Sequence, residues 1–267
     1  MTQFKNAMEI FKLLEKSNCK KCELPTCLAF AAAVFKGQKQ LGDCPQLDQD
    51  IVRRHAREPR RQSRIEADQE AAMSELKSKV AALDLGEAAR RIGAPFEKGR
   101  LTLRIMGKNF SVDTEGNLYS DIHVHVWVAG PVLNYILYSK GVPEAEKWVP
   151  MRELPHGNDW AQFFEHRCEK PLKRVADTYP ALFEDMVRLF NGRKTSNHYQ
   201  ADISLVLRPL PKVPILVCYW KPEEGLASSL NLFFDANAEQ NLPIESIYTL
   251  GAGLVQMFEK IALRHGS

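Results

Sequence analysis

The chain has 267 residues, of which 45% are hydrophobic, and a formal net charge of +3. This length suits two domains or one domain with a small module, and the apolar content is enough for a buried core. The small net charge does not indicate a nucleic-acid-binding protein, and no run of 18 apolar residues predicts a membrane span. The N-terminal residues lack the apolar segment and cleavage site of a secretory signal, so we expect a cytoplasmic protein.

Near the N-terminus, a predicted helix leads into a segment rich in cysteine. Residues 2–17 carry apolar side chains at helical spacing. Four of the six cysteines follow with the spacing C-x2-C-x4-C-x16-C, and they are Cys19, Cys22, Cys27 and Cys44. Thr26 is placed to cap a helix over residues 28–35, and Gly37 is placed to end it. Cys27 would then lie in the first turn, where backbone N–H groups and the helix dipole favour a thiolate.

Clustered cysteines in a cytoplasmic chain indicate thiolate chemistry and not disulfides. A structural zinc site usually takes its cysteines from two C-x2-C pairs, and here only Cys19 and Cys22 have that spacing. A redox-active dithiol at this pair would leave Cys27 and Cys44 without a role. Four thiolates that each bind one iron of a cube fit a [4Fe–4S] cluster, which we favour over zinc.

The residues around these cysteines resemble a known family. The matching positions are Asn18-Cys19, Cys22, Pro25 to Ala31, Gly37 and Cys44-Pro45. The pattern is similar to the small cluster module of the corrinoid iron–sulfur protein large subunit, and to that of the membrane-bound ferredoxin:NAD oxidoreductase B subunit. This resemblance implies a [4Fe–4S] cluster bound by the four cysteines. Glu23 departs from the pattern, which usually has glycine there, and an acid beside a ligand would lower the cluster potential.

A basic run follows the cysteine segment. Residues 51–64 contain six arginines and one glutamate, and the arginines are Arg53, Arg54, Arg57, Arg60, Arg61 and Arg64. A solvated linker or helix face is the simplest interpretation, and a docking strip for an acidic redox partner is the functional one. Because no aromatic side chains are interleaved for base stacking, we expect no nucleic-acid partner. The apolar pattern of residues 64–92 then predicts a connector helix, which Gly86 interrupts and residues 93–95 end.

A second domain is predicted to begin with an antiparallel meander. Alternating apolar residues predict strands over residues 101–105, 110–112 and 118–128. In the last of these, Asp121, His123 and His125 would share one strand face. Such a row could hold a second metal with ligands from elsewhere, but neighbours about 7 Å apart fit a single ion poorly. A polar, half-exposed strand face is the simpler interpretation.

The remaining pattern alternates between helices and strands. Helices are predicted over residues 131–140, 159–176, 180–190 and 243–264, and strands over 199–208, 214–220 and 230–234. We expect Cys168 and Cys218 to be packed thiols. The predicted fold class is α+β, with a small helical cluster module before a domain of antiparallel sheet and packed helices. The expected boundaries are residues 1–50 for the module, 51–94 for the basic linker and connector helix, and 95–267 for the α+β domain.

This second part also resembles a known family. The segments that carry the resemblance are 147–154, 208–211 and 232–236. They are similar to a domain of unknown function from anaerobic bacteria and archaea that is often fused to this cluster module. The resemblance implies an architecture and no activity, so it assigns no catalytic residue.

The chain has no motif that identifies an enzyme. It lacks a nucleotide-binding glycine loop, a nucleophile elbow and an H-E-x-x-H sequence. We therefore expect one-electron transfer to a redox or corrinoid partner in anaerobic metabolism. One alternative is that the second domain binds a corrinoid, another tetrapyrrole or a small substrate and receives electrons from the cluster. Another is a redox-sensing or assembly protein with a structural cluster.

Overall fold

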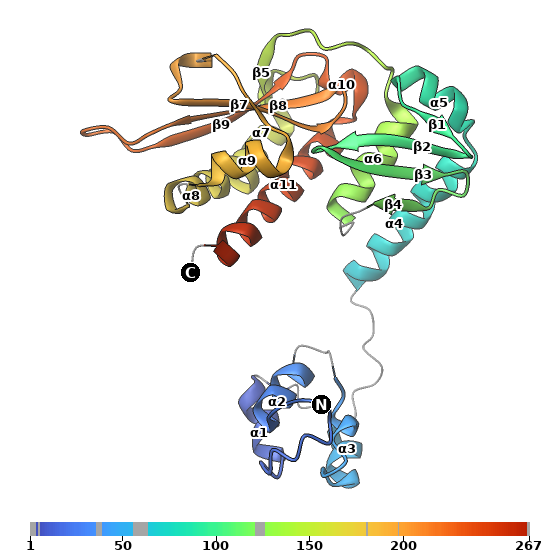
Figure 1. The fold of residues 1–267 in the computed structure, drawn as a ribbon, viewed down its shortest axis with the longest axis vertical. Coiled ribbons are helices and arrows are strands. Elements are labelled where there is room, and N and C mark those ends of the chain that lie inside the picture. The colour runs from blue at the N-terminus through green and yellow to red at the C-terminus, as the bar shows by residue number, and fades with distance from the viewer. Residues whose placement is uncertain are drawn as a thin grey trace. The chain divides into compact units, whose positions relative to one another are not determined.

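The computed structural model describes residues 4, 6–35, 39–55, 64–120, 126–179, 181–196 and 198–265. The chain divides into two compact units, Met1–Ala67 and Asp68–Ser267 (Figure 1). Each unit has a hydrophobic core of its own. The second unit contains two antiparallel sheets and several helices, which confirms the predicted α+β fold class.

The first unit is helical. It contains α1 (Ala7–Leu13), α2 (Cys27–Phe35), the 3-10 helix η1 (Leu41–Asp43) and α3 (Gln49–His55). Its core joins apolar side chains from α1 and α2 to three of the cysteines. Helix α1 begins at the Asn6 cap, whose side chain accepts the N–H of Glu9, and it ends at Leu13 because Leu14 is extended. It is therefore shorter than the predicted helix over residues 2–17.

Helix α2 begins as predicted. The hydroxyl of Thr26 accepts a hydrogen bond from the N–H of Ala29 at 3.0 Å, and Cys27 is the first residue of the helix. Phe30 and Ala31 are almost completely buried, so the helix packs closely within the unit. The predicted end at Gly37 lies outside the described residues.

The second unit opens with helices and a small sheet. It begins with α4 (Arg64–Ala81), whose first turn precedes Asp68, and continues with α5 (Leu85–Ile92), β1 (Phe96–Glu97), β2 (Arg100–Ile105), β3 (Lys108–Asp113), β4 (Leu118–Ser120) and α6 (Val126–Tyr138). The four strands form an antiparallel sheet in chain order. The alternating residues of β2 and β3 bury one face, as the sequence pattern predicts. Helix α5 packs into the same core.

A five-stranded antiparallel sheet forms the centre of this unit, in the order β5-β9-β8-β7-β6. The strands are β5 (Trp148–Pro150), β6 (Arg193–Lys194), β7 (Ile203–Leu210), β8 (Val213–Trp220) and β9 (Ser229–Asp235). Strand β8 is central and buried on both faces, which explains why it is apolar at almost every position. Cys218 lies on β8 and is fully buried, so the packed thiol is confirmed.

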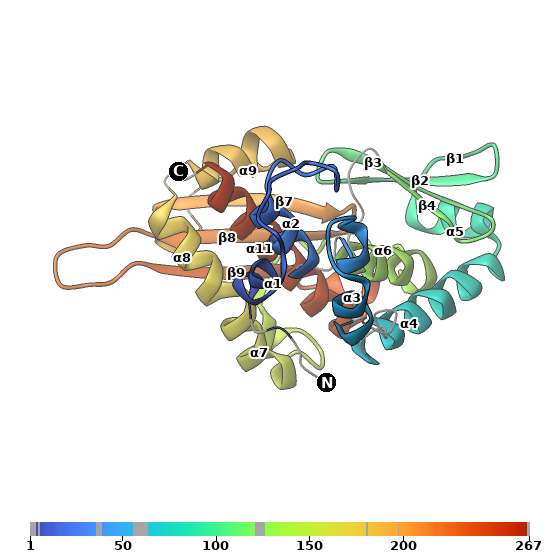
Figure 2. The same ribbon diagram turned by 90° about the horizontal axis from the view of Figure 1, so that it is seen from below.

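Helices cover one face of the five-stranded sheet. The remaining elements are η2 (Met151–Glu153), α7 (Asn158–Phe164), the π-helix η3 (Glu165–Glu169), α8 (Lys170–Thr178), α9 (Leu182–Phe190), η4 (His198–Gln200), α10 (Ala238–Asn241) and α11 (Ile244–His265). Helix α8 lies against β9 and α9 lies against β7, and α11 packs on α8 (Figure 1 and Figure 2). Their apolar faces form the main core together with the inner face of the sheet.

Two sequence predictions about these elements are wrong. The connector helix over residues 64–92 is two helices, because Asp84 caps α5 by accepting the N–H of Glu87 at 3.0 Å. Of the strand predicted over residues 118–128, the described residues confirm Leu118–Ser120, whereas helix α6 begins at Val126 and has Pro131 inside it. Apolar periodicity over a short buried segment does not distinguish a strand from a helix.

Candidate metal centre

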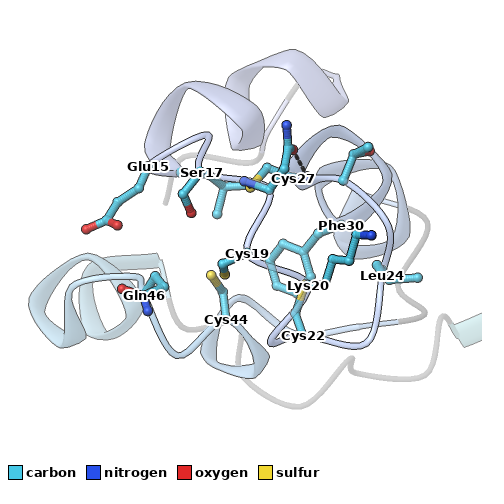
Figure 3. Close-up of a pocket in the computed structure, with 13 residues that line it drawn as sticks. Glu15, Ser17, Cys19, Lys20, Cys22, Leu24, Cys27, Phe30, Cys44 and Gln46 are labelled. Atoms are coloured by element: carbon cyan, nitrogen blue, oxygen red, sulfur yellow. Dashed lines mark hydrogen bonds between the residues drawn. The ribbon is translucent and has the colours of Figure 1, made fainter.

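The four clustered cysteines come from different local structures of the first unit. Cys19 and Cys22 lie in the loop after α1, Cys27 opens α2, and Cys44 directly follows η1. All four line one pocket, and Figure 3 shows Cys19 and Cys44 turned toward one another in it. The fold therefore brings together cysteines that are up to 25 positions apart in the sequence.

The pocket is closed on most sides by the protein. Cys22, Cys27 and Cys44 are each at most 9% exposed, whereas Cys19 is exposed. Leu14, Leu24 and Phe30 form apolar walls. The other lining residues are mostly polar, and they are Glu15, Ser17, Asn18, Lys20, Thr26 and Gln46. Three thiols are thus shielded from water, and one faces it.

Asn18 links the loop to the first turn of α2. Its side-chain oxygen accepts a hydrogen bond from the N–H of Cys27 at 2.8 Å. Its own N–H donates to the Cys27 sulfur at 3.3 Å. Asn18 belongs to the sequence pattern but received no role from it. The sequence does contain a signal for this role, because asparagine accepts hydrogen bonds and tolerates a left-handed backbone, and Asn18 stands directly before the first cysteine.

The backbone of this loop repeatedly enters the left-handed region. Lys16, Asn18, Lys20 and Glu23 have φ values of 58°, 49°, 59° and 65°. Turns of this kind direct successive backbone N–H groups to one side, which makes concavities for anions and for iron–sulfur groups. The left-handed φ at Glu23 is one that glycine would adopt without strain.

The surroundings of Cys19 favour its thiolate. A backbone hydrogen bond from Lys21, a side-chain hydrogen bond from Ser17 and the nearby charge of Lys21 lower the pKa of Cys19. A lowered pKa increases the thiolate fraction, and the thiolate is the form that binds metals. The one exposed cysteine of the set is thus prepared for ligation by its own loop.

The separation of the thiols is relevant to the kind of metal group. Among the described residues, no three His, Cys, Asp or Glu side chains form a group that could hold a single metal ion. With Zn–S bonds of about 2.3 Å, a tetrahedral zinc site would bring four sulfurs to roughly 3.8 Å from one another. A cluster accepts wider spacing because each thiolate binds a different iron.

The charge of Glu23 is partly balanced. Its carboxylate lies 3.2 Å from the ammonium of Lys39, and the Glu23 side chain is 85% exposed. Exposure and this ion pair both weaken the effect of the carboxylate on the pocket. We therefore expect a smaller decrease in cluster potential from Glu23 than the sequence alone implied.

Two other sets of predicted residues lie wholly or partly outside the described residues. Asp121, His123 and His125 are all outside them. Of the arginine run, Arg53 and Arg54 have a described backbone in α3, and Arg64 begins α4. The side chains of these three, and the whole of Arg57, Arg60 and Arg61, fall outside the described part of the chain.

Three aromatic residues of the second unit bear on the tetrapyrrole alternative, and they lie in two different places. Trp148 and Trp220 pack against the small core cluster that contains Leu216 and Cys218. Tyr219 instead lines a cleft with several charged side chains. The cleft thus has a lining that is partly charged and partly apolar.

Comparison with known families matches both parts of the chain. A family model for an Fe-S cluster matches residues 14–46, and the model of a domain of unknown function, DUF3786, matches residues 84–257. The first match contains all four clustered cysteines. Both resemblances predicted from the sequence, to an iron–sulfur module and to a domain of unknown function, are confirmed.

Curated relatives match the N-terminal module. The acetyl-CoA decarbonylase/synthase complex subunit gamma of Methanocaldococcus jannaschii is 46% identical over 43 residues, which are 16% of this chain and 9% of that protein. The corrinoid/iron-sulfur protein large subunit of Moorella thermoacetica is 50% identical over 38 residues, 14% of this chain and 8% of that protein. The chain thus spans less than a tenth of the length of these two relatives.

No solved structure matches the chain. Among the described residues, no helix is long and apolar enough to cross a membrane. The module and its relatives identify an iron–sulfur protein. Because the second model covers more than half of the sequence, the chain belongs to the DUF3786 family, whose function is unknown.

Proposed function

We propose that Cys19, Cys22, Cys27 and Cys44 bind a [4Fe–4S] cluster, and that the protein transfers single electrons through it. The observation that carries this proposal is the common pocket of the four cysteines, of which three are buried and Cys19 is exposed. A buried group with one accessible side suits electron transfer, since the protein shields the group while a partner can approach it closely.

A cluster of this kind would supply a one-electron couple, and the chain would set its potential and access. Hydrogen bonds to sulfur and local charge tune such potentials. The N–H groups of Asn18 and Lys21 reach the sulfurs of Cys27 and Cys19, and both bonds would raise the potential. The apolar walls of Leu14 and Phe30 would limit water on the buried side.

Basic side chains outnumber acidic ones around Cys19, where Glu15 and Glu23 are also exposed. Lys16, Lys20 and Lys21 are exposed beside Cys19 in the same loop. Positive charge around the point of closest approach favours a partner with an acidic surface. We propose that the arginine run from Arg53 to Arg64 adds to this attraction. Since one relative is named as a corrinoid/iron-sulfur subunit, a corrinoid protein is a candidate partner.

The test is anaerobic purification of the full-length chain, with iron and sulfide quantitation and EPR spectroscopy of the reduced protein. We expect about four irons and four sulfides per chain, and a reversible one-electron signal at low potential. The variant Cys44→Ser should lose iron and signal. The matched control Cys218→Ser removes a thiol that is buried in the second unit and should retain both.

Two results would contradict the proposal. Fewer than about three irons per chain together with bound zinc would exclude a [4Fe–4S] cluster. A complete cluster that cannot be reduced, but whose removal unfolds the module, would instead indicate a structural role.

The lysines beside Cys19 can be tested separately. The substitutions Lys20→Glu and Lys21→Glu should slow electron transfer to a partner with an acidic surface, and the decrease should be larger at low salt.

A further inference from the structure

A second pocket lies in the DUF3786 part of the chain, where no ligand is assigned. It is a cleft of about 680 Å³, within the range of small-molecule sites. Its walls come from the end of α8, the start of α9, and strands β6, β7 and β8. The lining residues all fall between Ala176 and Pro222, so the cleft is separate in sequence from the cysteine pocket.

The carboxylate of Asp177 is held in a fixed orientation in this cleft. Its Oδ1 accepts hydrogen bonds from the hydroxyls of Tyr219 at 2.9 Å and Ser228 at 2.7 Å. Its Oδ2 accepts a bond from the Lys173 ammonium at 2.7 Å. Partial burial raises the pKa of Asp177, but bonds from Lys173, Ser228 and Tyr219 outweigh it and leave the pKa below its usual value.

This carboxylate can still accept a further hydrogen bond. An ionised carboxylate has about four lone-pair positions, and three donors are present here. The Asp177 side chain is 30% exposed and lines the cleft. A ligand ammonium is the donor that gains most from such an acceptor, since both groups are charged.

The other charged residues of the cleft have both signs in equal number. Lys194 and Lys221 are basic, whereas Glu184 and Asp202 are acidic, and all four lie at its exposed rim. A ligand with only one kind of charge would meet repulsion on one side of this rim. A ligand with both charges can pair with both.

The base of the cleft is aromatic. Phe183 and Tyr219 are buried there, with ring centroids 5.1 Å apart and planes tilted by 38°. Ile203 adds an aliphatic surface. This base would take the apolar body of a ligand whose charged groups reach Asp177 and the rim.

We propose that this cleft binds a small zwitterion of the α-amino-acid class with an apolar side chain. The ammonium lies against Asp177, the carboxylate lies toward Lys194 and Lys221, and the side chain rests on Phe183 and Tyr219. The inference is independent of the cluster, because every residue that it uses belongs to the second unit.

The test is ligand-observed NMR on the full-length chain, with each of the twenty common α-amino acids as a probe at millimolar concentration. We expect saturation transfer to one or more apolar amino acids, and weaker transfer to their analogues that lack the amine or the carboxylate. Asp177→Asn should reduce affinity about tenfold to a hundredfold, as for the loss of a charged hydrogen bond. Asp113→Asn is the control, because Asp113 also accepts a tyrosine hydroxyl but lies on β3.

Because Tyr219 and Ser228 both donate to Asp177, a second variant that leaves these hydrogen bonds in place keeps the test decisive. Lys194→Gln removes the charge of an exposed rim residue, so it should weaken the binding of amino acids and leave the binding of the amine analogues unchanged. Absence of binding by all twenty probes would overturn the proposal. Equal binding to native protein and to both variants, or equal binding of analogues with one charge, would also overturn it.

Discussion

Replacing Asn18 with alanine should weaken the cysteine pocket without changing any sulfur. The Asn18 side chain accepts the Cys27 N–H at 2.8 Å, so it anchors the start of α2 to the preceding loop. The Asn18 φ of 49° lies in the left-handed region, which asparagine tolerates better than alanine. The substitution therefore removes a hydrogen bond and adds backbone strain at one position.

These two effects have similar sizes. Loss of the hydrogen bond costs about 1 kcal/mol. Alanine at a left-handed position costs about 1 kcal/mol more. We therefore expect Asn18→Ala to destabilise the first unit by about 2 kcal/mol. Asn18→Gly loses the same hydrogen bond but tolerates the backbone conformation, so it should cost only about 1 kcal/mol.

The hydrogen–deuterium exchange rate of α2, measured by mass spectrometry, reports how often this unit unfolds locally. The expected acceleration is roughly thirtyfold for Asn18→Ala and roughly fivefold for Asn18→Gly, since 1.4 kcal/mol corresponds to about a factor of ten. Asn191→Ala is the control, because Asn191 has a similar φ of 54° but ends α9 in the second unit. It should leave exchange in α2 unchanged.

Equal exchange in the alanine and glycine variants would show that backbone strain at Asn18 contributes nothing. Exchange at the native rate in both would refute the role of the Asn18 side chain in holding Cys27. The second result would remove Asn18 from the residues that shape the pocket.

Three further predictions concern other positions. Glu23→Gly should stabilise the first unit by up to about 1 kcal/mol, because Glu23 has a left-handed φ of 65° that glycine adopts without strain. This would be measured as slower hydrogen exchange of α2, and faster exchange would show that the ion pair of Glu23 with Lys39 contributes more. A hydrogen bond to Glu239 and the charge of its carboxylate raise the pKa of His156. The stabilisation from this pairing is therefore complete at pH values below the ordinary histidine pKa of about 6.5, and it is lost as the pH rises through the raised pKa. The melting temperatures of native protein and His156→Gln should therefore differ most near pH 6, and a pH-independent difference would contradict this pairing. Gly251→Ala should lower stability by about 1–3 kcal/mol in denaturant unfolding, because the added Cβ would lie 2.6 Å from an atom of Phe164. The control Gly130→Ala meets no atom within 4 Å, and it should be neutral or slightly stabilising.

Local patterns predicted much of the fold. Strands β2 and β8 and helices α9 and α11 lie close to their predicted positions, because each has a clear apolar period and polar or turn residues at its ends. The Thr26 cap at the start of α2 was also predicted, since capping depends on a few adjacent residues. These features need no information from distant parts of the chain.

Predictions failed where packing decides between two local possibilities. The segment from Val126 is a helix because α6 packs against α11, a contact that its own apolar pattern does not encode. The π-helix over Glu165–Glu169 was not predicted within the helix expected at 159–176. Its backbone places Cys168 in the core close to Gly251, and this depends on α11, far along the chain.

Cysteine spacing is enough to identify the candidate ligands of the cluster, and the Thr26 cap was equally predictable, because both are local properties. Tertiary structure decided that Cys44 returns to the loop of Cys19, that Asn18 bonds to Cys27, and that Asp177 meets Tyr219 and Ser228. The physical reason is that residue spacing fixes neighbours only within a turn, a helix face or a strand face. Contacts between distant segments follow from the burial of apolar surface over a whole unit, which no single stretch of sequence specifies.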